Sequence, residues 1–134
     1  MNDYQQKKEK DYVLPQTVYR QALYAVKDLD RLRRKLRFLK EEITSIKSPD
    51  PSDIRISGGS VSDLTGALAS ELIHTKSRID AIENAFFKVP EKYREGIGDK
   101  LVYDVPYDGG YCLNTWKKWQ QVFIYYVAKN LGIL

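Results

Sequence analysis

The sequence is poor in the residues that build covalent cross-links, metal sites and thiol chemistry. Its 134 residues include one cysteine, Cys112, and one histidine, His74. One cysteine excludes an intramolecular disulfide, and one histidine with no second ligand nearby argues against a metal centre, which needs three or four convergent ligands. A thiolate nucleophile would also need a base beside Cys112. We therefore expect a protein that is not an enzyme and that has no cofactor.

Long apolar runs are missing as well. No stretch reaches the roughly 18 consecutive apolar residues of a membrane span. The polar N-terminus, MNDYQQKKEK, lacks the apolar segment of a signal peptide. These features predict a cytoplasmic protein with no membrane partner.

Positive charge is only slightly in excess, but the excess is concentrated in one segment of the chain. The formal net charge is +4, and residues 27–47 hold eight basic against four acidic residues, which accounts for all of it. Residues 89–134 are nearly neutral, with six basic and five acidic residues. Because a polyanion attracts clustered positive charge, Arg33, Arg34 and Arg37 are predicted DNA contacts.

Apolar residues recur with helical spacing through the first part of the chain. After Pro15, which suits the first turn of a helix, intervals of three and four define one seam through Ala22, Ala25, Leu29, Leu32, Leu36, Leu39, Ile43 and Ile46. The segment from Pro15 to Lys47 is therefore predicted to be a single helix, ended by the prolines of Ser48-Pro-Asp-Pro.

A second helix is predicted to begin near Ser60, with Ser60 and Asp63 as a capping box and a heptad seam of its own. After the loop at residues 48–59, the two helices would form an antiparallel hairpin. Because their flanks carry further apolar residues, we expect a dimer. Its predicted contacts are Leu29, Leu32, Leu36, Leu39 and Ile43.

Two shorter helices are predicted in the C-terminal part. The first begins at Pro90, carries Tyr93, Ile97 and Leu101 on one face, and is weakened by Gly96 and Gly98. After the turn-rich VPYDGG, a last helix is predicted from Asn114 as N-cap to about residue 130, with Gly132 just past its end.

The last helix is predicted to have an inner and an outer face. Its apolar stripe contains Trp116, Trp119, Phe123, Val127 and Leu131. Thr115, Lys117, Lys118 and Gln121 would then point outward, as in a recognition helix whose lysines contact phosphates and whose glutamine pairs with adenine. A core stripe flanked by solubilising lysines fits the same pattern equally well.

The stretch VPEKYREGI resembles the opening of sigma-factor region 4, a helix-turn-helix module that reads promoter DNA. Together with LVYDVPY and NTWKKWQQVFIYYVAKNLG, it resembles phage-encoded late-gene transcriptional regulators of the RinA/ArpU type. The resemblance places Thr115, Trp116, Lys117, Lys118 and Gln121 at the start of the recognition helix. It implies transcription regulation in a bacterial host cell, with double-stranded DNA as partner and RNA polymerase as a second one. Residues 101–114 leave room for at most one turn of the usual middle helix.

The sequence thus predicts an all-α protein with three parts. These are a flexible N-terminus (1–14), a coiled-coil-like helical hairpin for oligomerisation (15–88) and a helix-turn-helix-like module (89–134). Two other functions stay open, a small terminase-like packaging or other phage assembly subunit and a helical protein-binding adaptor. A ring of eight or more subunits would favour packaging, whereas a dimer would favour the regulator.

Overall fold

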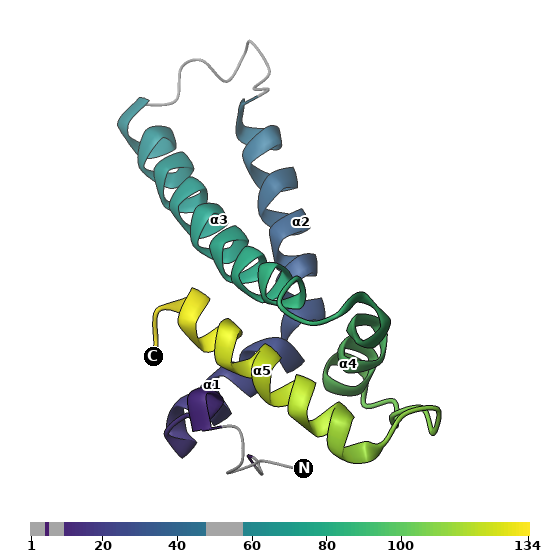
Figure 1. Ribbon diagram of the computed structural model, residues 1–134. Helices are drawn as coiled ribbons and strands as arrows, with labels where there is room; N and C mark the ends of the chain where they lie inside the picture. Colours follow the sequence, from purple (N-terminus) through teal and green to yellow (C-terminus); the bar gives the residue numbers. More distant parts are fainter. Residues whose placement is uncertain (1–4, 6–9, 48–57) are drawn as a thin grey trace. The chain divides into compact units, whose positions relative to one another are not determined.

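A computed structural model describes Gln5 and residues 10–47 and 58–134. In this part of the chain the regular secondary structure is entirely helical, which confirms the all-α class. A short 3-10 helix, η1 (Lys10–Tyr12), precedes the α-helices (Figure 1). These are α1 (Gln16–Lys27), α2 (Leu29–Lys47), α3 (Gly58–Phe86), α4 (Glu91–Tyr103) and α5 (Leu113–Leu131).

Some predicted features fall outside the described residues. They include the loop at residues 48–57 and the capping side chains of Ser60 and Asp63. The end of the predicted N-terminal tail is described, and it is structured: η1 forms, and Leu14 is buried. The Gln5 side chain holds the Leu14 backbone with two hydrogen bonds, of 2.7 and 2.9 Å. Residues 10–14 thus have a defined conformation here, and the flexibility of the N-terminus stays a prediction.

The chain divides into two units. Unit 1 comprises residues 1–30 and 80–134, and unit 2 comprises residues 31–79. Unit 1 differs from the predicted C-terminal module, which began at residue 89, because α1 packs on both α4 and α5. The end of α3 also belongs to it, and the Asn130 side chain donates a hydrogen bond of 3.0 Å to the Ala81 carbonyl.

The predicted helix from Pro15 to Lys47 is interrupted, so the prediction of one continuous helix is wrong. At Asp28 the backbone turns to φ −90° and ψ 1°, and its amide donates to the carbonyls of Tyr24 and Ala25. The break separates Ala22, which lies in the core of unit 1, from Leu32, which lies in unit 2. The apolar spacing runs across the break unchanged, so it reveals neither the break nor the passage of the seam from unit 1 to unit 2 after residue 30.

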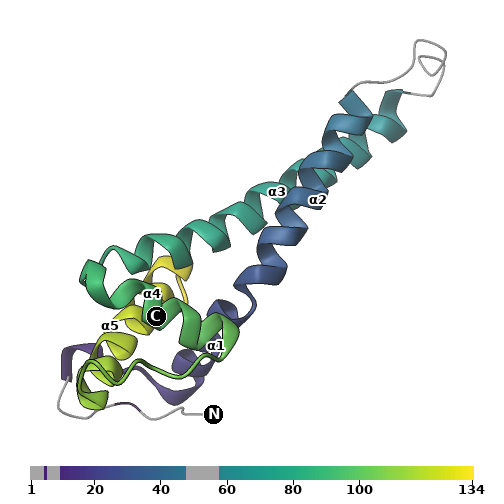
Figure 2. The ribbon, with the colours of Figure 1, turned by 90° about the vertical axis from the view of Figure 1, so that its right-hand side faces the viewer.

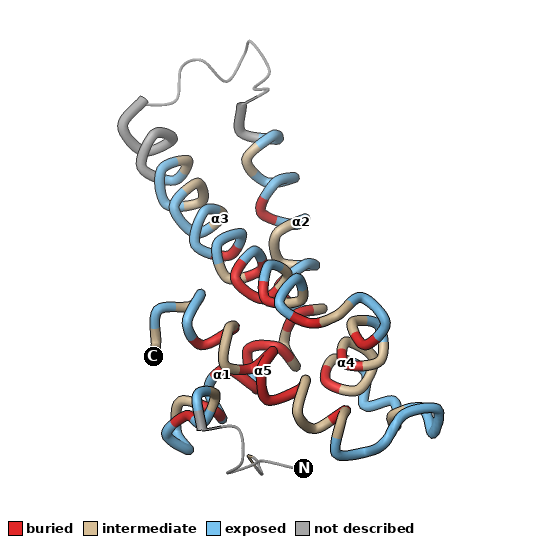
Figure 3. The backbone as a smooth tube through the Cα atoms, in the orientation of Figure 1, coloured by how far each residue is buried: buried red, intermediate tan, exposed pale blue. Residues whose placement is uncertain are grey.

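The core of unit 1 joins α1, α5, α4 and the end of α3, where buried positions gather (Figure 3). Tyr93, Ile97 and Leu101 are buried, which confirms the predicted inner face of α4. Phe123 of α5 is fully buried and stacks on Phe86 with ring centroids 4.3 Å apart. The largest fully buried side chains of this unit are Tyr19, Leu23, Val26, Leu29, Ile82, Val89, Ile97, Gln121, Phe123, Ile124 and Val127.

The turn between α3 and α4 is fixed by an arginine. The Arg94 Nε–H donates to the carbonyl of Phe86 at 3.0 Å and to that of Val89 at 2.9 Å. The last carbonyls of a helix lack partners within the helix, so this side chain satisfies the end of α3. It thereby sets where α4 begins relative to α3.

A glycine in α4 makes room for a tryptophan of α5. A β-carbon at Gly96 would lie 2.5 Å from the Trp116 ring, whereas one at Gly98 would meet Phe86 at 3.5 Å, an ordinary contact. Trp116 is 3% exposed and its indole N–H donates to the Asp108 carbonyl at 3.0 Å, so the ring has little freedom to move away. The helix-weakening glycine at position 96 is therefore required by packing.

This difference gives a paired prediction. Gly96→Ala should lower the free energy of unfolding by about 1 kcal/mol, because overpacking costs about 1–3 kcal/mol and the gain in helix propensity returns about 1 kcal/mol. Gly98→Ala should raise it by up to about 1 kcal/mol, since only the propensity gain applies. Urea denaturation followed by circular dichroism measures both. A stabilised Gly96→Ala protein would contradict the described packing of Trp116.

Unit 2 is a pair of helical segments. The parts of α2 and α3 within residues 31–79 run side by side in opposite directions, as both views show (Figures 1 and 2). Leu32 and Leu39 of α2 and Thr75 and Ile79 of α3 are buried. On the surface, the Lys35 ammonium lies 2.7 Å from the Glu71 carboxylate. None of the helices in the described part of the chain is long and apolar enough to cross a membrane.

Most side chains of the predicted dimer seam are already buried by other residues of the same chain. Leu29, Leu32 and Leu39 are buried, and only Leu36 and Ile43 are half-buried. A side chain already covered by its own chain has little apolar area left for a partner. The assignment of these three leucines to a dimer contact is therefore wrong for this arrangement of the helices, and dimerisation itself stays a prediction.

Candidate nucleic-acid interface

The first turns of α5 form the surface that the sequence predicts as the start of a recognition helix. The helix begins at Leu113 with Cys112 as N-cap, so Asn114 is its second residue and not the predicted cap. At the other end Gly132, with φ 75°, terminates the helix as predicted. Leu113 and Asn114 are exposed, whereas Thr115, Lys117 and Lys118 are half-buried.

Trp116 does not lie on this surface. Its ring stacks on Tyr107 with a centroid distance of 4.7 Å and an interplanar angle of 7°. The indole N–H donates to the Asp108 carbonyl, so the residue joins α5 to the segment before it. The assignment of Trp116 to DNA contact is therefore wrong, because its side chain fills the core.

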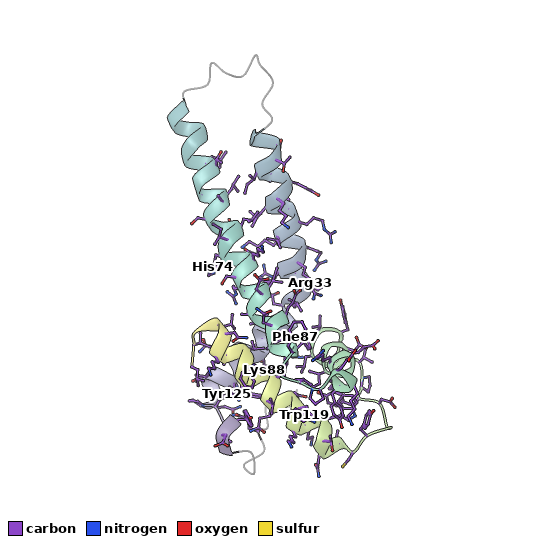
Figure 4. All side chains as sticks on the ribbon, turned by 45° about the horizontal axis from the view of Figure 1, so that its top comes forward. Arg33, His74, Phe87, Lys88, Trp119 and Tyr125 are labelled. Carbon is purple, nitrogen blue, oxygen red and sulfur yellow. The ribbon has the colours of Figure 1, made fainter. Side chains whose placement is uncertain are left out.

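The sequence pattern also predicts the wrong orientation for the Gln121 side chain. It was predicted to point outward, but its side chain is 2% exposed and its Nε2 lies 3.4 Å from the Tyr12 carbonyl. The cause is η1, which covers the middle of α5: the Tyr12 ring lies 5.3 Å from that of Tyr125 and 6.2 Å from that of Tyr126. Figure 4 labels Trp119 and Tyr125 on this helix. A buried Gln121 cannot reach a base edge.

Lysines of three helices line one pocket of unit 1, which the sequence did not predict. The pocket has a volume of about 410 Å³ and is lined by Lys27 of α1, Lys100 of α4 and Lys117 of α5. Lys118 does not line it; its ammonium lies 5.1 Å from the centre of the Trp119 ring. The sequence predicts Lys117 and Lys118 as phosphate contacts. The pocket shows that Lys27 and Lys100 also lie near the N-terminal end of α5.

A hydrogen-bonded chain of neutral groups lies beside the lysines. The Tyr107 hydroxyl donates to the Gln120 side-chain oxygen, and the Gln120 amide donates to the Tyr19 hydroxyl at 3.3 Å. Burial, and secondarily the nearby Tyr19, raises the pKa of the Tyr107 phenol far above its usual value. Tyr107 therefore stays uncharged and adds no negative charge to this surface at neutral pH.

The predicted arginines lie in the other unit. Arg33, Arg34 and Arg37 are exposed on α2. Arg33 and Arg37 share a helix face with Lys40, because spacings of four and three residues bring side chains to one side. Figure 4 labels Arg33 on α2 and the exposed His74 on α3. These arginines belong to unit 2, whereas the lysines around α5 belong to unit 1.

Within the described residues no group of three His, Cys, Asp or Glu side chains could hold a metal ion. Cys112 is exposed at the N-cap of α5. Comparisons with protein-family models, curated proteins and solved structures found no match to this chain. The likeness to phage regulators therefore rests on the sequence motifs alone.

Proposed function

We propose that the protein binds double-stranded DNA and regulates transcription of phage or prophage genes in a bacterial host. The observation that carries the proposal is the gathering of Lys27, Lys100 and Lys117 beside the first turns of α5, where Lys118 is also accessible. Clustered lysines attract the phosphate backbone, and a helix N-terminus contributes positive potential of its own. The sequence likeness to sigma region 4 also supports a DNA interface at the N-terminal end of α5.

In this proposal most of the affinity comes from the DNA backbone. Gln121 and Trp116 are buried, so readout of bases falls to the accessible Asn114 and Thr115. Asparagine pairs with adenine in the major groove, and threonine contacts several bases less specifically. A protein of this kind would show weak sequence preference and strong dependence on salt. RNA polymerase remains a second expected partner.

The proposal predicts how single lysines affect binding. Lys117→Ala and Lys118→Ala should each weaken binding to any duplex and flatten the slope of log affinity against log salt by about one unit, because one phosphate contact is lost. Fluorescence anisotropy of a labelled duplex at several salt concentrations measures both effects. Lys129→Ala is the matched control, since Lys129 is exposed near the other end of α5.

Two results would contradict the proposed interface. Equal losses for Lys118→Ala and Lys129→Ala would mean that only net charge matters. Loss of binding after replacement of Arg33, Arg34 and Arg37, with the Lys117/Lys118 double variant unaffected, would move the interface to unit 2.

A second candidate is a helical adaptor that binds another protein. It is favoured by large apolar side chains exposed on the segment from the end of α4 to the start of α5, namely Tyr103, Val105, Tyr111 and Leu113. Aromatic side chains are enriched at protein interfaces. If the folded protein binds no duplex at low salt, this function becomes the better explanation of the same surface.

A further inference from the structure

We infer that the pocket between α1, α4 and α5 is a phosphate-binding site that holds a phosphoryl group between Lys27, Lys100 and Lys117. For a phosphate of the DNA backbone the inference rests on the proposed function; for a free phosphomonoester it does not. The pocket volume of about 410 Å³ falls in the range of small-ligand sites, roughly 300–1,000 Å³.

The charge of the pocket favours an anion. Three lysines and one aspartate, Asp104, are among the lining residues, and their formal charges sum to +2. In the described part of the chain none of the three lysines has a carboxylate at ion-pair distance. Cations that converge on a concave surface repel one another, and an anion between them relieves this repulsion. A phosphoryl group carries one negative charge in a DNA diester and nearly two in a monoester.

The positions of Lys27 and Lys100 also have a simpler explanation, the helix ends at which they lie. Lys27 and Lys100 stand in the last turns of α1 and α4, where a cation favours the helix dipole by about 0.3–1 kcal/mol. That role is local to each helix and does not require the side chains to meet. That they line one pocket together with Lys117, which lies near the opposite end of its own helix, is what points to a shared ligand.

The remaining lining suits a phosphate ester more than a bare ion. Leu23, Leu101, Pro106 and Leu113 supply the apolar part of the lining, with Leu23 and Leu101 buried and Leu113 exposed at 55%. The neutral Tyr107 and Gln120 form the polar part of the lining, so Asp104 is the acidic group there. An ester can place its charged end among the lysines and its carbon skeleton against the leucines.

Tryptophan fluorescence gives a direct test on the full chain. Trp116 stacks on Tyr107, a lining residue, so an occupant of the pocket should change its emission. Inorganic phosphate should give a saturable change at constant ionic strength, whereas chloride should not. Lys27→Gln and Lys100→Gln should each weaken the apparent affinity by about tenfold, the loss of one charge-assisted hydrogen bond. Lys129→Gln should leave it unchanged.

A second arm with a short DNA duplex separates the two sources of phosphate. Competition between inorganic phosphate and duplex, with both weakened by Lys27→Gln and Lys100→Gln, supports a backbone phosphate in the pocket. Saturable, lysine-dependent phosphate binding without duplex binding supports a free phosphomonoester and contradicts the proposed function. Duplex binding that neither variant weakens, with no saturable phosphate signal, overturns the inference and leaves the proposed function standing.

Discussion

Replacing Trp116 with alanine is expected to lower the free energy of unfolding by about 3–5 kcal/mol, as for other large aromatic residues in a core. The side chain is almost fully buried, stacks on Tyr107 and bonds the Asp108 carbonyl. Its loss would leave a cavity beside Gly96 and release the segment that joins α4 to α5. Chemical denaturation followed by circular dichroism is the suitable measurement, because the substitution removes one of the two tryptophans on which fluorescence would depend.

Trp119→Ala provides the matched control three residues along the same helix. Trp119 is half-buried and stacks on Tyr93 at a centroid distance of 6.0 Å, so its loss should cost distinctly less. If the two substitutions cost the same small amount, Trp116 does not fill the core. Its predicted role on the DNA-binding surface would then return.

Leu39→Asp is expected to destabilise the helix pair of unit 2 by at least about 3 kcal/mol, since it combines lost apolar burial with a charge in an apolar site. Leu39 is 3% exposed on α2. Hydrogen exchange should show faster exchange at the backbone amides of α2 and α3, and thermal unfolding should begin at a lower temperature. The loss should shrink at a pH below the pKa of the introduced carboxyl, because the protonated form carries no charge.

Phe38→Asp, at the neighbouring position, tests whether this loss is specific. Phe38 is 58% exposed, so the same substitution should change stability by no more than about 0.5 kcal/mol. A larger loss at Phe38 than at Leu39 would show that a different face of α2 is buried, for example in a dimer.

Local spacing was enough to predict the helices and much of their orientation. The stripe Tyr93, Ile97 and Leu101 is buried, and Gly132 ends α5, because both features depend on residues within a few turns. The break at Asp28 could not be predicted in this way. No proline or glycine marks it, and the apolar spacing continues through it. Leu29, directly after the break, is still buried in unit 1, and the apolar residues from Leu32 onward belong to unit 2.

The site was predicted less well, since its members depend on distant partners. Gln121 follows the spacing of an outward residue, but the N-terminal η1 covers it. Nothing in the polar N-terminal sequence signals that Tyr12 packs on α5. In the same way, Lys27 and Lys100 have no feature that separates them from other surface lysines until α1, α4 and α5 are brought together.

The discontinuous composition of unit 1 has a consequence for synthesis on the ribosome. Residues 31–79 are contiguous and can pair as soon as they emerge, whereas α1 finds its main packing partner, α5, only about a hundred residues later. Until then the apolar face of α1, with Leu23 and Val26, is open to water and to other nascent chains. Contacts of such long sequence separation form slowly, and exposed apolar surface promotes aggregation. The nascent protein is therefore expected to be most vulnerable, and most dependent on chaperones, between the emergence of α1 and that of α5.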